Sequence, residues 1–419
     1  MGMSRTFPGL FRSFGLELEY MLVKQRSLDV APIADRVLAM GAAGRMTNEV
    51  DRGIMAWSNE LALHVIEIKN SEPVAELPGL VEAFQAQVEE ISDLAGQLDA
   101  ILLPTAMHPW MTPHSDTKLW PHGNHEIYDA YHRIFNCQGH GWSNLQSAHL
   151  NLGFTNDEEF GRLHGAIRLL LPIMPAITAS SPLAEGRLAG MVDSRLHHYR
   201  LNQRAIPILT GRVVPEQVYS HDDYEKQIYQ RIATAIAPHD PEGILEPVWL
   251  NSRGAIARFD RNAIEIRILD IQECPLADVA IAVLISAALQ GLVEEQWCGW
   301  KTQRAMKVEP LAELFESVIR DGEETVISDP DYLTLFGLSG KGSIRAGDLW
   351  RELAERCRPL LTAAGPAIGD AVTTVLEQGP LARRILRALG QNSDRELMRQ
   401  VYGSLADCLH TGRLFVESR

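Results

Sequence analysis

Three segments of this 419-residue chain share one alternating design, and that design most constrains the fold. Successive side chains of a β-strand point to opposite faces of the sheet, so residues two apart share a face. Each segment places apolar residues on one face and polar residues on the other. The polar sets are Glu17 and Glu19; Ser147, His149 and Asn151; and Glu265 and Arg267. The pattern predicts strands over 14–23, 145–154 and 262–269, each with one apolar face and one face that bears Glu, His, Asn or Arg.

A fourth segment, 60–68 (ELALHVIEI), is also typical of a strand, but its acidic residues separate less cleanly. Counting in steps of two puts Glu67 on the side of Leu61 and Leu63, and leaves Glu60 on the other side. A β-bulge would change this register. The sequence therefore leaves open which of the two glutamates joins the polar face.

Carboxylates gathered on one sheet face repel one another, and burying them without a cation is costly. A bound metal ion removes that cost. Carboxylate oxygens with one imidazole suit Mg²⁺ or Mn²⁺ better than zinc, which favours sulfur and nitrogen. The pattern alone is also compatible with plain solvated strand faces and with a structural, hydrogen-bonded His149. The candidate metal ligands are Glu17, Glu19, Glu60 or Glu67, His149 and Glu265.

Arginines are concentrated in the connection 181–220 and in the hairpin region after it. Because the chain has a net charge of −15, arginines grouped near acidic strands indicate recognition of phosphate or carboxylate groups, with surface ion pairing as the alternative. The sequence contains neither a P-loop nor a GxGxxG motif. If ATP binds, we therefore expect metal ions and arginine to hold it. The arginines are Arg187, Arg195, Arg200, Arg204, Arg212, Arg253, Arg258, Arg261 and Arg267.

The composition excludes several classes of protein. The 54 acidic residues outnumber the 39 basic ones, which argues against nucleic-acid binding and against docking on an anionic membrane. The five cysteines are widely spaced, which fits a reducing compartment and makes a zinc cluster improbable. No N-terminal stretch resembles a signal peptide, and the most apolar run, 279–293, is too short to span a bilayer. We expect a cytoplasmic protein in which that run is a buried helix.

The remaining patterns predict a short strand at 101–105, an irregular loop at 107–125 and a hairpin strand at 255–259. Helical patterns cover 79–98, 125–135, 157–180, 222–236 and 276–297, with prolines at 172 and 175 that can kink the third. Beyond residue 300 the chain is mostly helical, over 308–320, 346–362, 366–377, 379–389 and 393–409. We expect a boundary there, between a first part, 1–300, and a helical C-terminal region, 301–419.

The order of the motifs resembles the second family of glutamate–cysteine ligases, the carboxylate–amine ligases. The resemblance covers about residues 14–297, departs from the usual pattern at Asn151 and Leu152, and leaves 301–419 without a matching motif. The motifs are Gly15-Leu16-Glu17-Leu18-Glu19; Glu60 to Glu67; Met107-His108-Pro109-Trp110; Gln146-Ser147-Ala148-His149-Leu150-Asn151; Ala179-Ser180-Ser181-Pro182 with Gly186, Arg187 and Ser194-Arg195; and Glu265-Ile266-Arg267 with Asp270.

This resemblance implies an α+β fold, with a curved antiparallel β-sheet like that of glutamine synthetase and helices on its outer face. The first 300 residues would be the catalytic domain. ATP would phosphorylate a carboxylate, usually the γ-carboxylate of glutamate, and an amine would attack the acyl phosphate to form an amide with release of ADP and phosphate. The expected cofactors are ATP and Mg²⁺ or Mn²⁺, the partners are small-molecule substrates, and relatives with this sheet suggest a homodimer.

The resemblance also implies residue roles. The metal ligands would be the acidic residues and His149 named above. Catalysis would involve Arg267, Arg195 and Arg187, the last two as anchors for a substrate carboxylate or the transferred phosphoryl group. Cofactor binding would involve Arg267, Arg258 and Ser147, and substrate binding His108, Trp110, Asn151 and Arg200. Two alternatives stay open: another metal-dependent phosphotransferase or hydrolase on the same sheet, and a non-catalytic family member that acts as a binding partner.

Overall fold

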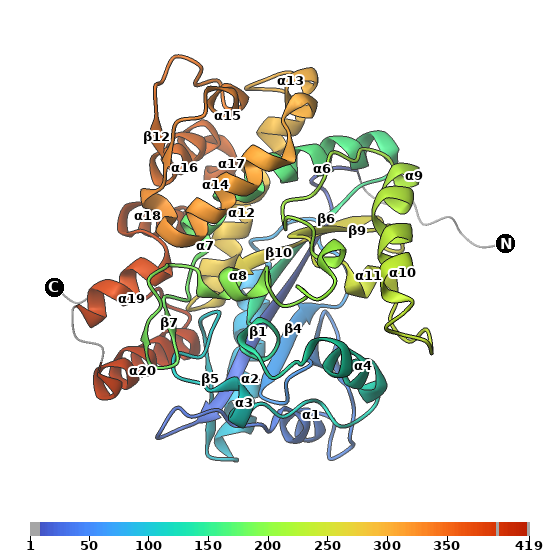
Figure 1. Cartoon of the computed structure of the whole chain (residues 1–419). Helices are drawn as coiled ribbons and strands as arrows, with labels where there is room; N and C mark the ends of the chain where they lie inside the picture. Colours follow the sequence, from blue (N-terminus) through green and yellow to red (C-terminus); the bar gives the residue numbers. More distant parts are fainter. Residues whose placement is uncertain (1–8, 391–393, 417–419) are drawn as a thin grey trace.

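The computed structural model describes residues 9–390 and 394–416. Its centre is an eight-stranded sheet in which β5 pairs with β1 outside the main order β2-β3-β4-β1-β6-β10-β9 (Figure 1). All of these pairings are antiparallel, as predicted. The strands of this sheet are β1 (Phe14–Lys24), β2 (Glu49–Arg52), β3 (Met55–Asn59), β4 (Val65–Asn70), β5 (Ala100–Leu103), β6 (Ser147–Gly153), β9 (Ala255–Arg258) and β10 (Ala263–Asp270). Two small hairpin sheets pair β7 (Leu183–Ala184) with β8 (Arg187–Leu188) and β11 (Val326–Ile327) with β12 (Ile344–Arg345).

Helices surround this sheet. Before residue 300 they are α1 (Ala34–Gly41), α2 (Leu80–Gly96), α3 (Pro113–Asp116), α4 (His125–Phe135), α5 (His140–Ser143), α6 (Asp157–Leu170), η1 (Leu171–Ile173), α7 (Pro175–Thr178), α8 (Ser194–Tyr199), η2 (Pro207–Leu209), α9 (His221–Tyr224), η3 (Glu225–Tyr229), α10 (Gln230–Ile236), α11 (Pro247–Leu250) and α12 (Pro275–Val293). The C-terminal region is helical, as predicted, with α13 (Trp300–Ala305), α14 (Val308–Asp321), η4 (Gly322–Glu324), α15 (Pro330–Leu335), α16 (Ala346–Arg356), α17 (Arg358–Ala363), α18 (Pro366–Gln378), α19 (Leu381–Leu389) and α20 (Arg395–Thr411).

Most predicted elements match the structure, and the differences have local causes. The single helix predicted over 157–180 is divided into α6, η1 and α7, because Pro172 and Pro175 lack the backbone N–H that a continuous helix needs. The hairpin of β2 and β3 was not predicted. The strand predicted over 60–68 begins only at Val65, after a turn.

The apolar face of the sheet and the long helices form the core. Leu16, Leu18 and Ile266 are buried in one hydrophobic cluster that also contains residues of α2, α6 and α12. Helix α12 is apolar on nearly all sides and packs against α2, α6 and α18, which is typical of a core helix. The expectation that the apolar run is too short to span a bilayer was wrong on length, because the helix begins at Pro275 and, among the described residues, is long and apolar enough to cross a membrane. The expectation of a buried helix is confirmed, since 83% of its most apolar 18 residues are buried inside the protein.

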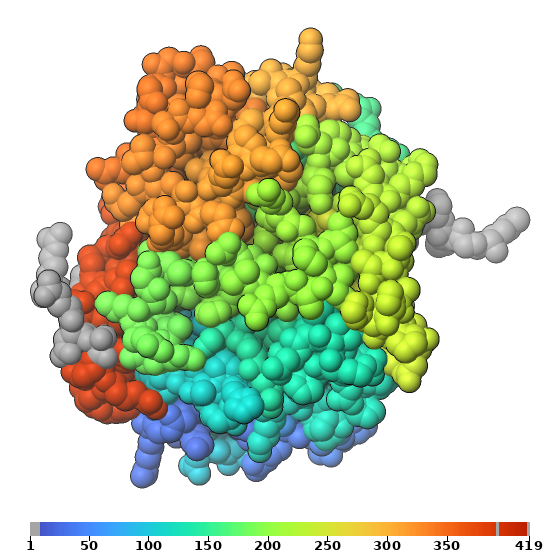
Figure 2. Space-filling view, viewed as in Figure 1, coloured from blue at the N-terminus to red at the C-terminus, as the bar shows by residue number. Residues whose placement is uncertain are grey.

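Helices α14 to α18 belong to the same hydrophobic cluster as the sheet, through residues such as Trp350 and Val375. Helix α19 and most of α20 form a second cluster with Met21 of β1 and Leu103 of β5. Helix α18 packs on α12, and α20 packs on β5 and α2. The division at residue 300 stays a prediction. The segment around residue 200, green in Figure 2, crosses the middle of one face of the molecule between the C-terminal helices and the N-terminal half.

Candidate active site

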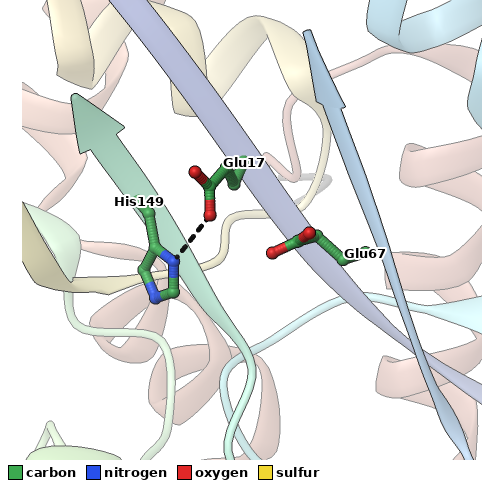
Figure 3. Close-up of side chains that lie close together, drawn as sticks. All are labelled: Glu17, Glu67 and His149. Carbon is green, nitrogen blue, oxygen red and sulfur yellow. Dashed lines mark hydrogen bonds and ion pairs between the residues drawn. The ribbon is translucent and has the colours of Figure 1, made fainter. Parts of the chain in front are cut away.

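The polar faces of three neighbouring strands converge at the centre of the sheet. In the antiparallel register Glu17 on β1 lies opposite His149 on β6, and Glu19 lies opposite Glu67 on β4. Opposite residues of an antiparallel pair project from the same face. Figure 3 shows Glu17, Glu67 and His149 pointing toward one space, with His149 Nδ1 3.2 Å from Glu17 Oε2. We call Glu17, Glu19, Glu60, Glu67, Glu265 and His149 the acidic cluster.

Both glutamates of the fourth segment join the acidic cluster. Because β4 begins at Val65, the alternation of side chains is counted from that residue. It puts Glu67 and Lys69 on one face of the strand and Ile66 and Ile68 on the other. Glu60 comes from the turn before the strand. Carboxylate oxygens of Glu19, Glu60 and Glu67 lie within 4.8 Å of one another, as do donor atoms of Glu17, Glu67 and His149. Glu67 thus belongs to two potential metal-binding groups.

Neutral hydrogen-bond donors on β6 hold the carboxylates of β1. Ser147 donates to Glu19 Oε2 through its backbone N–H (2.7 Å) and through its hydroxyl group (3.0 Å). Asn151 Nδ2 donates to Glu17 Oε1 at 3.1 Å. The two residues predicted for cofactor and substrate binding therefore orient the predicted metal ligands in this structure.

The hairpin of β9 and β10 brings positive charge to one end of the acidic cluster. Glu265 lies opposite Asn151 of β6. Arg267 donates to Glu265 Oε1 through Nη2 (2.5 Å), and Arg258 Nη1 donates to Glu265 Oε2 (3.4 Å). Two guanidinium groups at a carboxylate edge form a suitable environment for phosphate oxygens.

The electrostatics divide the acidic cluster into two parts. Burial raises the pKa of Glu19 and, together with the charge of Glu17, that of Glu67. Burial and the charges of Glu19 and Glu67 raise the pKa of Glu60 well above its usual range. Of these three, Glu67 has the Lys69 ammonium group at 2.9 Å, whereas Glu19 and Glu60 have no arginine or lysine partner among the described residues. A divalent cation among the three carboxylates would relieve the repulsion.

The other part of the acidic cluster has its own cations. Burial opposes ionisation of Glu265, but the charges of Arg267 and His149 outweigh it and lower its pKa to about 2. Burial also disfavours charged His149, yet the hydrogen bond to Glu17 and the charge of Glu19 raise its pKa to about 9. His149 is thus an imidazolium at neutral pH, and a metal ion bound to it must displace its proton.

A β-bulge in β10 explains how Asp270 reaches the polar side of the sheet. Counting in steps of two puts Asp270 on the face opposite to Glu265, but the register shifts by one residue between Ile266 and Leu269. Asp270 therefore lies opposite Ser147. There it accepts a hydrogen bond from Arg195 Nε at 2.5 Å, and both side chains are buried.

His108 and Trp110 lie in a packed loop rather than in direct contact with the carboxylates. His108 is fully buried, and its Nε2 lies 2.7 Å from the Leu28 carbonyl oxygen. Trp110 Nε1 donates to Asp29 at 3.2 Å, and the Arg395 guanidinium of α20 lies 4.3 Å above the indole ring. The role predicted for both residues in substrate binding stays a prediction.

The remaining predicted arginines occupy contrasting environments. Arg187 is exposed on the β7–β8 hairpin, where it pairs with Glu185 at 2.9 Å. Arg200 pairs with Glu316 of α14 at 2.6 Å. The geometry does not test the catalytic role predicted for Arg187 or the substrate-binding role predicted for Arg200. Arg195, by contrast, is buried and contacts Asp270 and the backbone carbonyl group of Arg267.

Sequence reasoning missed Ser58 and Lys69, which contact the acidic cluster from its β3–β4 side. Ser58 donates to Glu67 Oε1 at 2.6 Å, and Lys69 Nζ lies 2.9 Å from the same oxygen. Lys69 follows Glu67 by two residues, so the correct strand start would have placed it on the polar face. Ser58 lies on the hairpin strand that was not predicted.

All five cysteines are free thiols in the described structure.

Comparison with solved structures defines the class of fold. A glutamate–cysteine ligase of Francisella tularensis, solved in complex with AMP, superimposes with a TM-score of 0.62 and 13% sequence identity over 97% of this chain and 90% of that chain. A bifunctional glutathione synthetase from Pasteurella multocida has a TM-score of 0.63 at 13% identity, over 95% of this chain and 53% of that chain. The architecture is therefore that of glutamate–cysteine ligase structures.

Comparison of sequences identifies the family of this chain, which the likeness in fold alone does not. The family model of glutamate–cysteine ligase family 2 matches residues 13–403, and the chain belongs to this family. The match extends through the helical region for which no motif was recognised. An uncharacterized protein of Archaeoglobus fulgidus is 31% identical over 94% of this chain and 98% of its own length. A protein of Bordetella petrii named "Putative glutamate--cysteine ligase 2" is 27% identical over 65% of this chain, and the alignment spans 61% of that protein.

Proposed function

We propose that the protein is an ATP-dependent carboxylate–amine ligase that forms a γ-glutamyl amide through an acyl phosphate, with release of ADP and phosphate. The observation that carries this proposal is the convergence of five carboxylates on one sheet face, with arginines at one end. In such a reaction two negatively charged groups, a phosphate and a carboxylate, must approach each other. Proteins lower the electrostatic repulsion between two such groups with positively charged side chains and bound metal ions.

The acidic cluster would hold the metal ions. One group is Glu19, Glu60 and Glu67, and the other is Glu17, Glu67 and His149, with Glu265 beside it. The donor set fits Mg²⁺ or Mn²⁺, because it consists of carboxylate oxygens with a single imidazole. When bound, such ions neutralise phosphate oxygens. Ser147 and Asn151 would keep Glu19 and Glu17 oriented during this step.

Arg267 and Arg258 are the proposed contacts to the ATP phosphates. Both guanidinium groups lie at Glu265 on the β9–β10 hairpin, and each keeps N–H groups beyond those used there. The Francisella neighbour, which was solved with AMP, supports a nucleotide in this fold.

Arg195 is the proposed anchor for the substrate carboxylate or the transferred phosphoryl group. Its Nε is held by Asp270 and its Nη1 donates to the Arg267 carbonyl oxygen. Within the described residues Nη2 has no hydrogen-bond partner. Because a buried guanidinium N–H without a partner is unfavourable, this nitrogen is the proposed donor to a substrate oxygen. Arg187, His108, Trp110 and Arg200 are proposed as further substrate contacts on the sequence resemblance alone.

The test is a product assay. The purified protein would be incubated with ATP, Mg²⁺ and L-glutamate, with and without a panel of amines that includes cysteine, while ADP is followed by a coupled assay and products by mass. We expect ADP release that depends on glutamate and one amine, with the mass of the amide. A phosphorylated acceptor or a cleaved bond would instead identify a phosphotransferase or hydrolase. Absence of ATP–Mg²⁺ binding would indicate a non-catalytic member of the family.

A further inference from the structure

Lys69 brings a permanent positive charge to the carboxylate that both potential metal groups share. It lies on the polar face of β4, opposite Glu17 on β1. Its ammonium group is 2.9 Å from Glu67 Oε1, 2.9 Å from Ser58 Oγ and 3.4 Å from Glu49 Oε2. The first two contacts are hydrogen bonds, and the third is a longer ion pair. The Lys69 side chain is thus held in one place rather than extended into solvent.

We propose that Lys69 lowers the affinity of the acidic cluster for divalent ions in the absence of nucleotide, so that metal binds tightly only together with the nucleotide phosphates. This inference rests on the proposed function, since it concerns the metal ions of that site. Lys69 would be a positioning residue, because it acts on the metal through Glu67. It would set the order in which metal and nucleotide are taken up.

The contacts of Glu67 show how this would work. Oε1 receives both Lys69 and Ser58, so Oε2 is the oxygen that stays available for a metal ion. A divalent ion at Oε2 would then share one carboxylate with an ammonium group. Like charges that share a carboxylate repel each other, and the metal affinity falls accordingly.

Nucleotide changes this balance, because its phosphates bring several negative charges to the same metal ion. The repulsion from one ammonium group is then a small part of the total interaction. Since 29% of the Lys69 side chain is exposed, solvent and salt screen part of its charge. We expect an effect on the order of tenfold in metal affinity at low ionic strength, decreasing as salt is added.

A purely structural role for Lys69 makes a different prediction. If Lys69 only kept Glu67 in place, its removal would weaken metal binding. Ser58 still donates to Glu67 Oε1 at 2.6 Å, so Glu67 retains an anchor when Lys69 is replaced. The charge and the positioning of Lys69 can therefore be separated by Lys69→Met and Lys69→Arg, of which only the second keeps the charge.

The experiment measures Mn²⁺ binding by electron paramagnetic resonance, without nucleotide and with the β,γ-imido analogue of ATP. We expect Lys69→Met to bind Mn²⁺ about tenfold more tightly than the wild type without nucleotide, and within about threefold of it with the analogue. Lys69→Arg should resemble the wild type. Lys341→Met is the matched control, because it removes the same charge from an exposed lysine that pairs with Glu352 at 2.7 Å. Thermal melts would establish that each variant is folded.

Two results would overturn the inference: Lys69→Met that binds Mn²⁺ no more tightly than the wild type without nucleotide, or a gain that is equally large with the analogue. Failure of the proposed function looks different. If no amide is formed with any substrate while Lys69→Met still tightens Mn²⁺ binding selectively, the ligase proposal fails and the role of Lys69 stands.

Discussion

Asp270 lies on the same strand as Glu265 of the acidic cluster, but its hydrogen bonds differ from those of other carboxylates in that cluster. Asp270 is saturated: Oδ1 accepts from Arg195 Nε, while Oδ2 accepts from the Ser180 backbone N–H (2.8 Å) and the Ser181 hydroxyl group (2.9 Å). In the acidic cluster Glu60 has no ion pair with any of the described residues, and Glu19 is held mainly by the neutral donors of Ser147.

This difference in hydrogen bonding distinguishes carboxylates that stabilise the fold from carboxylates that become favourable only when a cation binds. A buried carboxylate with a full set of donors needs nothing further, whereas carboxylates that repel one another are unfavourable until a cation binds. We therefore expect opposite responses to mutation: loss of stability for Asp270, and loss of function without loss of stability for Glu19 and Glu60, which form no ion pair with an arginine or lysine among the described residues.

The largest effect is expected for Glu19→Gln. The amide keeps the size of the side chain but removes a charge that the proposed metal ion requires, so we expect ATP turnover to fall on the order of a thousandfold or more, about 4 kcal/mol. The free energy of unfolding should stay unchanged or increase without metal, because burial and the charge of Glu67 raise the pKa of Glu19 in spite of the charge of His149. Turnover and urea denaturation would be measured on the same preparation.

Glu90→Gln is the control, since Glu90 is partly exposed and pairs with Arg52 away from the acidic cluster. It should keep wild-type turnover. If Glu19→Gln retains turnover, or loses several kcal/mol of stability, then Glu19 stabilises the fold as Asp270 does. The proposed difference between Asp270 and the acidic cluster would then be wrong.

Asp270→Asn should have the next largest effect, on stability. It removes the ion-pair partner that directly contacts the buried Arg195 guanidinium, and breaking a buried pair in this way typically costs about 3–5 kcal/mol. Burial lowers the pKa of Arg195, but the charges of Asp270 and Asp193 outweigh this effect and keep it ionised. Urea denaturation would measure the loss, and Arg195→Met in the same chain should recover part of it. No recovery in the double variant would mean that the charge of Arg195 is not the cause.

Buried histidines provide a third case, in which the neutral form is the stable one. Burial lowers the pKa of His64 and of His164 to about 3. The unfolded chain binds these protons below about pH 6.5, whereas the folded protein does not bind them until about pH 3. Their contribution to stability is therefore complete above pH 6.5 and is lost as the pH falls through this window, by about 1.4 kcal/mol per pH unit for each histidine.

His164→Phe tests this slope, because His164 stacks on Phe160 and a phenyl ring fits that aromatic environment. Urea denaturation at pH 7, 6 and 5 should show a shallower loss of stability in the variant than in the wild type. Equal slopes would mean that His164 is already protonated in the folded protein.

The strands of the site were predictable because their alternation is regular. Glu17, Glu19, His149 and Glu265 were placed on the correct faces from a period of two, and antiparallel pairing then brings them together. Where the period breaks, the prediction fails. The late start of β4 hid the role of Lys69, since the residues before Val65 form a turn and do not count in the alternation.

The order of strands and the contacts of loops are not contained in local patterns. Ser58 contacts Glu67 because β3 of the β2–β3 hairpin pairs with β4. The five residues of β3 have no sequence pattern from which a strand was predicted. Asp270 faces Arg195 because of a bulge, which depends on packing with β6 rather than on local propensity. Motif resemblance supplied the set of residues, and only the three-dimensional structure separates buried Arg195 from exposed Arg187.

The smallest effect is expected for Arg187→Gln, and it sharpens the contrast with Arg195. The Arg187 side chain is 74% exposed and pairs with Glu185 on the same hairpin, so we expect its loss to change the free energy of unfolding by less than about 0.5 kcal/mol. Because stability is preserved, the variant gives a clean measure of the catalytic role predicted for Arg187 from sequence. A large fall in turnover, with an unchanged urea midpoint, would mean that Arg187 takes part in the reaction. Wild-type turnover would remove Arg187 from the proposed site and leave Arg195 in it.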